Sequence, residues 1–111
     1  MAETTIDEVG EGTIAKYKLT AETSGVALQS ADSWVFSVTG TKGTVEISST
    51  DTTNVINNTD HYVVFIDTSK TGTGVLKGRV RMEIVDTDYT DANGGNIRPE
   101  VSLAFEVLKV S

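Results

Sequence analysis

The stretch from Phe65 to Val101, FIDTSKTGTGVLKGRVRMEIVDTDYTDANGGNIRPEV, decides the fold class of this chain. A glycine-rich turn, Thr71–Gly74, stands between an apolar run and the segment Val75–Asp86, in which apolar and charged residues alternate. Alternation with a period of two is typical of a strand with one buried face, so both segments are predicted to be strands joined by a hairpin turn. An acidic, glycine-rich loop follows and ends at a further strand.

Strand signals also occupy the rest of the chain, and no stretch has the apolar periodicity of a helix. Ser33–Thr39 places Trp34, Phe36 and Val38 on one face, and the turn after it predicts a hairpin with Thr44–Ser48. Further strands are predicted at Thr13–Thr23, at His61–Asp67 and at Val101–Val110, the last with Val101, Leu103, Phe105 and Val107 facing the core. About seven short strands predict an all-β fold, a single antiparallel β-sandwich of the Ig-like or jelly-roll-like type.

Length and composition limit the organisation of the chain. Its 111 residues correspond to one domain, and the absence of cysteine excludes disulfides and thiolate metal sites. Residues 1–12 are acidic, lack the profile of a secretory signal and offer only Ile6 and Val9 as apolar anchors. We therefore expect residues 1–12 to be a flexible or partner-bound arm and residues 13–111 to be the sandwich.

The charge balance narrows the classes of partner. The chain has 9 Lys and Arg against 16 Asp and Glu, a net charge of -7, whereas nucleic-acid binding requires a basic stripe. No apolar run reaches the length of a membrane span. We expect neither a nucleic-acid nor a membrane partner.

Catalytic residues are not apparent in the sequence. His61 is the single histidine, cysteine is absent, and no Gly-x-Ser-x-Gly motif is present. Nucleophilic catalysis needs a nucleophile, a base and an oxyanion hole, so we expect no enzymatic activity.

The acidic loop contains the one candidate metal site. Asp86, Asp88, Asp91 and Asn93 could supply oxygen ligands to calcium, although their spacing differs from that of an EF-hand. The alternative is a long loop between strands in which Asp and Asn cap turns and glycines adopt positive φ. No other cofactor is expected.

Arg98-Pro99-Glu100 closes the acidic loop and admits two interpretations. Either it forms part of a contact surface, or Arg98 pairs with a loop carboxylate while Pro99 occupies an edge strand, where no ladder hydrogen bond is lost. Tyr89 lies within the loop and is a candidate surface aromatic residue of the kind that stacks on sugar rings.

Several parts of this stretch, in this order, resemble a family of phage proteins. They are Asp67-Thr68, Gly72 and Gly74 before the long strand, Asp86-Thr87-Asp88-Tyr89, and Gly95 followed by Arg98 and Glu100-Val101. The pattern is similar to that of small β-sandwich virion structural proteins from tailed bacteriophages of gut Bacteroidota, the crAss-like phages. The resemblance implies a non-enzymatic fibre, collar or capsid decoration protein. It would be located in the virion and assembled in the host cytoplasm, with other virion proteins as partners.

The resemblance also implies assembly as a homo-oligomer or docking to larger virion proteins. The residues expected to form the interface are Ile6, Val9, Tyr89, Arg98 and Glu100. The alternative function is a carbohydrate- or surface-binding β-sandwich module, with or without calcium, in which Tyr89 and the loop aspartates form the site.

Overall fold

Two β-sheets packed face to face make up most of the protein. The structure, a computed structural model, describes residues 7–20, 22–23, 26–28, 31–58 and 61–111. Within these residues it contains 11 strands, three of them only two residues long, and one short helix. The prediction of an all-β sandwich is confirmed, with more strands than the seven expected.

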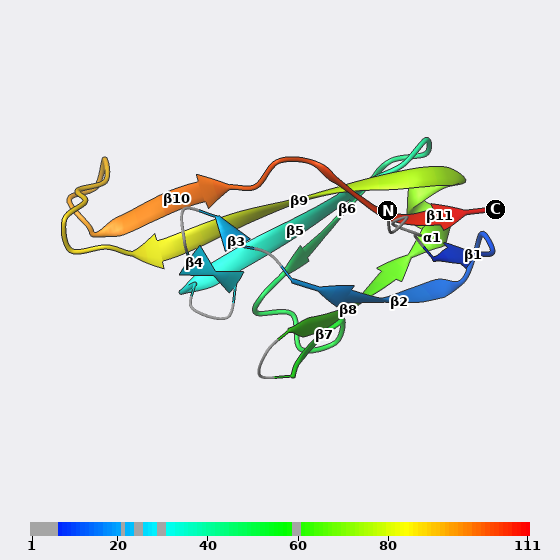
Figure 1. Cartoon of the computed structure of the whole chain (residues 1–111), viewed down its shortest axis with the longest axis horizontal. Coiled ribbons are helices and arrows are strands. Elements are labelled where there is room, and N and C mark those ends of the chain that lie inside the picture. The colour runs from blue at the N-terminus through cyan, green and yellow to red at the C-terminus, as the bar shows by residue number, and fades with distance from the viewer. Residues whose placement is uncertain (1–6, 21, 24–25, 29–30, 59–60) are drawn as a thin grey trace, which may run out of the picture.

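The larger sheet holds six strands. They are β1 (Glu8–Val9), β5 (Ser33–Thr39), β6 (Thr44–Ser48), β9 (Gly74–Val85), β10 (Ile97–Val101) and β11 (Phe105–Val110). Their order is β1–β11–β9–β5–β6, and β10 also pairs with β9. Since β5 pairs with one edge of β9, β10 and β11 follow one another along the other edge (Figure 1).

The smaller sheet covers one face of the larger. It has the order β2–β8–β7 and consists of β2 (Ile14–Leu19), β7 (Val55–Asn57) and β8 (Tyr62–Asp67). A separate pair is formed by β3 (Glu22–Thr23) and β4 (Val26–Ala27), and helix α1 spans Thr68–Thr71. No helix in the described part of the chain is long and apolar enough to cross a membrane.

The strand order is that of an immunoglobulin-type sandwich. Strands β11, β9, β5 and β6 take the places of G, F, C and C′, and β2, β8 and β7 those of B, E and D. The buried Trp34 lies on β5, in the position of strand C, where immunoglobulin domains also carry a buried tryptophan. The long β9–β10 connection is therefore the counterpart of the F–G loop.

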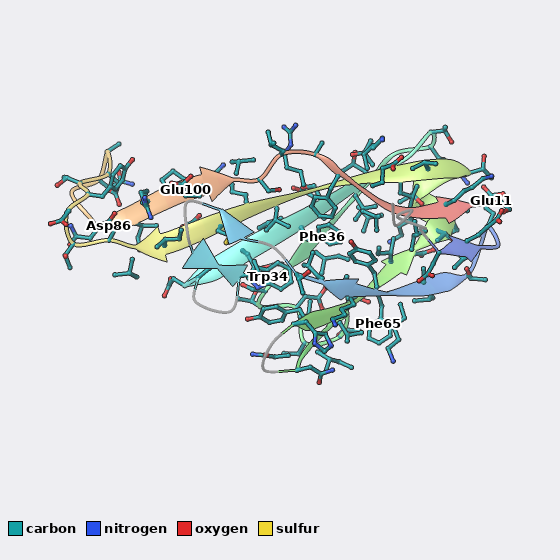
Figure 2. All side chains as sticks on the ribbon, viewed as in Figure 1. Glu11, Trp34, Phe36, Phe65, Asp86 and Glu100 are labelled. Atoms are coloured by element: carbon teal, nitrogen blue, oxygen red, sulfur yellow. The ribbon has the colours of Figure 1, made fainter. Side chains whose placement is uncertain are left out.

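The core lies between the sheets and is built by alternating residues. Trp34, Phe36 and Val38 are all buried, as their spacing predicts. Aromatic rings join the two layers: the ring centroids of Phe36 and Tyr17 lie 5.9 Å apart, and those of Trp34 and Tyr62 lie 4.9 Å apart. Figure 2 shows Trp34 and Phe36 between the sheets.

The expected hairpin at Thr71–Gly74 is wrong, because β8 and β9 belong to different sheets. The chain crosses between the layers through α1, whose N-cap is Asp67. The Thr68 hydroxyl donates a hydrogen bond of 2.7 Å to the Thr13 carbonyl and fixes the crossing on β2. The turn after α1 contains Gly72 (φ 82°) and Gly74 (φ 100°). Both have positive φ values that residues other than glycine rarely adopt, so the turn requires glycine at these positions.

The expected continuous strand at Val101–Val110 is also wrong. The chain breaks between β10 and β11, where the Ser102 hydroxyl accepts a hydrogen bond from the Val80 amide. A bulge between Glu106 and Lys109 then places both Val107 and Leu108 in the core. As a result, Val101 and Leu103, which were expected inside, are exposed.

Part of the expected N-terminal arm belongs to the sandwich. Glu8–Val9 forms β1, which pairs with β11 in the parallel direction, so the sandwich is not wholly antiparallel. The Lys109 and Ser111 amides donate to the carbonyls of Asp7 and Val9 at 2.8 and 2.9 Å. Val9 is half-buried against the core, and the other expected anchor, Ile6, lies outside the described residues.

Candidate functional site

The β9–β10 hairpin extends past the rest of the sandwich and presents one face to solvent (Figure 1). Residues of β9 alternate between buried and outward positions. Because directly paired residues point to the same side of a sheet, the β10 residues that pair with outward β9 residues also face outward. The hairpin face consists of the three pairs Val85–Ile97, Glu83–Pro99 and Arg81–Val101, and Leu103 follows it just past the end of β10.

Several apolar side chains on or beside the hairpin face are exposed to solvent. Val85, Val101 and Leu103 are 60%, 51% and 89% exposed. Ile97 is half-buried and Pro99 is exposed beside them. Contiguous exposed apolar residues on a soluble domain mark a binding surface more often than scattered ones do.

The charged residues on the outer side of β9 differ in whether they have an ion-pair partner among the described residues. Arg79, Arg81 and Glu83 form no ion pair with any other described residue, whereas Lys77 contacts Glu106 at 3.4 Å. Arg79 and Arg81 are exposed, and Glu83 is half-buried. These groups are therefore available to a partner.

The acidic loop after β9 is held together by Asp91. Its carboxylate accepts hydrogen bonds from the amides of Asn93, Gly95 and Ile97 at 2.8, 3.0 and 3.4 Å. The bonds from Gly95 and Asn93 lower the pKa of the Asp91 carboxyl below its ordinary value. Asp91 therefore caps the turns of the loop, as the alternative to calcium binding predicts.

The remaining candidate calcium ligands are also placed by this loop. Asp86 accepts a hydrogen bond from the Asp88 amide at 3.0 Å, and its second oxygen lies 3.4 Å from Arg98 Nε. Asp88 and Asn93 are exposed. Across the described residues, no three His, Cys, Asp or Glu side chains are gathered as a metal site would require. Calcium binding by these four residues stays a prediction.

Arg98 and Glu100 point away from the hairpin face. They pair with Ile84 and Met82, whose side chains are buried. A guanidinium nitrogen of Arg98 lies 3.3 Å from a Glu100 oxygen, and the two side chains are 29% and 23% exposed. The pairing of Arg98 with the loop carboxylate Asp86 and the edge position of Pro99 are therefore confirmed.

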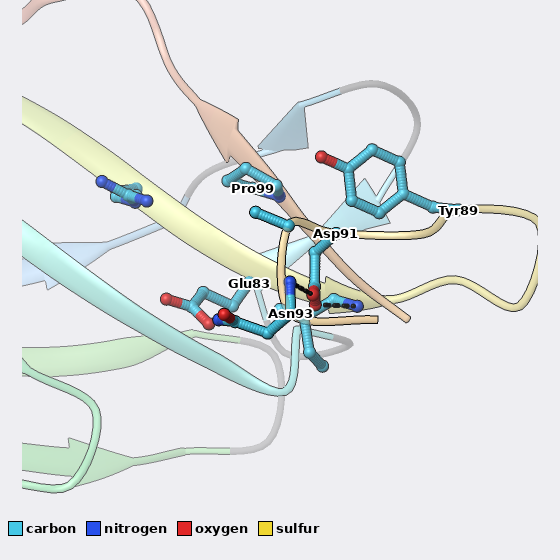
Figure 3. Close-up of a pocket in the computed structure, with 8 residues that line it drawn as sticks. Glu83, Tyr89, Asp91, Asn93 and Pro99 are labelled. Atoms are coloured by element: carbon cyan, nitrogen blue, oxygen red, sulfur yellow. Dashed lines mark hydrogen bonds between the residues drawn. The ribbon is translucent and has the colours of Figure 1, made fainter. Parts of the chain in front are cut away.

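A hollow of about 480 Å³ lies where the acidic loop meets the hairpin face (Figure 3). Its lining residues come from β9, the loop and β10: Arg81, Glu83, Tyr89, Asp91, Ala92, Asn93, Ile97 and Pro99. Sequence reasoning singled out Tyr89, Asp91 and Asn93, and the structure brings these together. It missed Arg81, Glu83 and Pro99 as site residues, although the alternation along β9 already turned the first two outward.

A second hollow of about 270 Å³ lies towards the other end of β9. It is lined by Ser37, Thr39, Lys77, Gly78, Arg79 and Ala104. Its charged members are Lys77 and Arg79, whereas the first hollow adjoins the loop aspartates. Along β9 the outward charges thus change sign from one end to the other, with Lys77 paired to Glu106 of β11 at the basic end.

Comparisons with protein-family models, with curated proteins and with solved structures give no match for this chain.

Proposed function

We propose that this chain is a non-enzymatic structural protein of a phage virion, and that it binds a protein partner through the hairpin face. The observation that supports this most directly is the row of exposed apolar side chains, Val85, Val101 and Leu103, next to charges without a partner in the described domain. Burial of such side chains in a protein interface is favourable by about 25 cal/mol per Å² of apolar surface.

Three of the sheet edges, β10, β2 and β7, favour contact through a face over addition of a strand. An unprotected edge strand recruits other strands, and proteins block this with proline, lysine or very short edges. Here β10 carries Pro99, β2 carries Lys16 and Lys18, and β7 has only three residues. Strand addition at these edges is therefore disfavoured.

The assignment to a virion is supported by the resemblance of the Phe65–Val101 stretch to phage structural proteins. The quoted positions have structural roles here: Asp67 caps α1, Gly72 and Gly74 make the crossing between sheets, and Asp86 contacts Arg98. The pattern thus specifies the layer crossing and the β9–β10 hairpin. We place the protein among fibre, collar or decoration components that assemble in the host cytoplasm.

Incorporation into particles tests the proposal. Antibodies against the purified chain should label phage particles in immunogold electron microscopy. The double variant Val101→Ser/Leu103→Ser should fold but lose labelling when it replaces the natural chain, whereas Ile14→Ser, a comparably exposed residue on the other sheet, should retain it. Particles without label from the natural chain, or with full label from the double variant, would contradict the proposal.

The hollow supports a second candidate, a carbohydrate- or surface-binding module. Tyr89 provides a ring and Glu83, Asn93 and Arg81 provide hydrogen-bonding groups around an open depression, as sugar recognition requires. A glycan array that shows selective binding, lost in Tyr89→Ala, would favour this function. The same array with calcium and then with chelator would show whether the loop aspartates bind a metal.

A further inference from the structure

Charged side chains along the outer face of β9 are ordered by sign. Lys77, Arg79 and Arg81 occupy successive outward positions, Glu83 occupies the next, and the acidic loop follows. One end of the face is therefore basic and the other acidic. A surface of this kind is complementary to an identical surface laid on it in the opposite direction, which is what a two-fold symmetric interface requires.

The register of the hairpin fixes where such an axis would pass. Met82 and Glu100 are paired, so they lie in one row across β9 and β10. Consider a two-fold axis that is parallel to this row and lies between two stacked hairpin faces. It reverses the strand direction of the second copy and keeps β9 of that copy opposite β9 of the first. Arg81 and Glu83 lie one position on either side of Met82, so each would face the other residue of the second copy.

The same axis aligns the apolar residues. Val101 and Pro99 lie one position on either side of Glu100, so Val101 of one copy faces Pro99 of the other. Ile97 lies three positions from Glu100 at the rim of the large hollow, and the 89% exposed Leu103 lies past the opposite end of β10, so the axis brings Leu103 towards the end of the second copy that holds Ile97. One operation therefore covers Val101 and Pro99, pairs Arg81 with Glu83, and places Val85 opposite Arg79 of the second copy.

The two hollows are matched by this arrangement. Lys77 and Arg79 lie three to five positions before Met82, and the acidic loop begins with Asp86, four positions after it. At about 3.3 Å per residue, the loop of one copy reaches the basic hollow of the other. The exposed carboxylate of Asp88 would then lie near Lys77 and Arg79 of the second copy.

The other way of stacking two identical faces is disfavoured by charge. An axis that runs over β9 and along it would place β9 parallel to its counterpart, with Arg81 facing Arg81 and Glu83 facing Glu83; an axis between β9 and β10 would instead place the charged β9 row on the apolar β10 row. Juxtaposed like charges in an interface are strongly unfavourable, and this chain already carries a net charge of -7. The antiparallel arrangement is the one that offsets this repulsion.

We propose that the partner of the hairpin face is a second copy of this chain, bound antiparallel about a two-fold axis along the Met82–Glu100 row. This inference rests on the proposed function, because it names the partner of the same surface. It makes the dimer isologous: Arg81 of each copy pairs with Glu83 of the other, and every residue of the interface is used twice.

A charge swap within one chain tests this geometry. The dissociation constant of the dimer is measured by analytical ultracentrifugation over a concentration series of the full chain. Arg81→Glu and Glu83→Arg should each weaken the dimer by about tenfold or more, since each places like charges opposite one another twice. The double variant Arg81→Glu/Glu83→Arg restores opposite charges in both pairs and should recover most of the affinity.

Controls separate the possible outcomes. Lys16→Glu alters a lysine of the smaller sheet by the same amount of charge and should leave the dimer unchanged. A monomer at all concentrations, or a dimer indifferent to both single swaps, would overturn the inference. If the chain is monomeric but Val101→Ser/Leu103→Ser still abolishes incorporation into particles, the partner is another protein and the proposed function stands. If the chain is monomeric and Val101→Ser/Leu103→Ser is incorporated normally, both the dimer and the proposed function are wrong.

Discussion

Gly78 lies directly against Phe36 at the centre of the larger sheet. A Cβ atom at Gly78 would lie 2.8 Å from Phe36 Cε1 and 2.6 Å from Val107 Cγ2. The ring of Phe36 stacks on that of Phe105 with centroids 6.0 Å apart, so both rings pack where a side chain at position 78 would be. The absent side chain of Gly78 thus makes room for the aromatic contact between β5 and β11.

Substitution of Gly78 by alanine should destabilise the domain by about 1–3 kcal/mol, because the rings of Phe36 and Phe105 must move. Urea denaturation of the variant measures the change. Gly10→Ala serves as the control, since nothing lies within 4 Å of a Cβ at that position. Equal stabilities of the two variants would show that the core near Gly78 accommodates an added methyl group without loss of stability.

Arg98 joins the end of β9 to β10 through two carboxylates. Arg98→Ala should cost roughly 1–2 kcal/mol, because it leaves Glu100 partly buried without its cation. Arg98→Lys should recover only part of this, since one ammonium cannot contact both Asp86 and Glu100 as a guanidinium does.

Chemical denaturation at two salt concentrations measures the role of Arg98. Glu106→Ala is the matched control, because the Lys77–Glu106 pair is more than half exposed on both sides and should contribute little. A loss for Arg98→Ala no larger than that for Glu106→Ala would mean that the pairing of Arg98 is incidental.

Local alternation in the sequence predicted the buried faces of β5 and β9, but not that of the C-terminal segment, where Val101 and Leu103 are exposed. Trp34, Phe36 and Val38 face the core because a period of two can bury only one side of a strand in a sandwich. The pairing of strands was less predictable. Gly72 and Gly74 have the positive φ of a turn, but turn geometry does not state whether the next strand joins the same sheet, and here it joins the other.

The site was predicted in part for the same reason. Tyr89, Asp91 and Asn93 are neighbours in sequence and remain neighbours in the hollow. Pro99 and Arg81 join them only through the register of β10 on β9, a long-range property that a single sequence does not reveal. The exposure of Leu103 depends on the end of β10 at Val101, after which the Ser102 hydroxyl accepts a hydrogen bond from the Val80 amide.

Tyr17 should ionise at a higher pH than a solvent-exposed tyrosine. Burial raises the pKa of its hydroxyl above the ordinary value of about 10, because the charged form loses hydration beside Phe36. Since the folded pKa exceeds the unfolded one, the contribution of Tyr17 to stability is fully present below the unfolded pKa and is lost as the pH rises through the folded pKa.

An alkaline titration followed by tyrosinate absorbance, with the natural chain and with Tyr17→Phe, tests this shift in pKa. The transition that Tyr17→Phe removes should have a midpoint above about 10. A lost transition with a midpoint at or below that value would contradict the effect of burial.

Asp91 should make the order of the acidic loop depend on pH. Hydrogen bonds from the Gly95 and Asn93 amides favour the ionised carboxylate and lower its pKa below the unfolded value of about 3.9. The bonds therefore stabilise the loop fully above that pH, and the contribution is lost as the pH falls through the lower, folded pKa.

In an NMR titration, the Gly95 amide shift should change with a midpoint below about 3.9. Asp91→Asn should abolish this transition and speed hydrogen exchange at Gly95. A midpoint at or above the unfolded value would mean that these hydrogen bonds do not hold the loop.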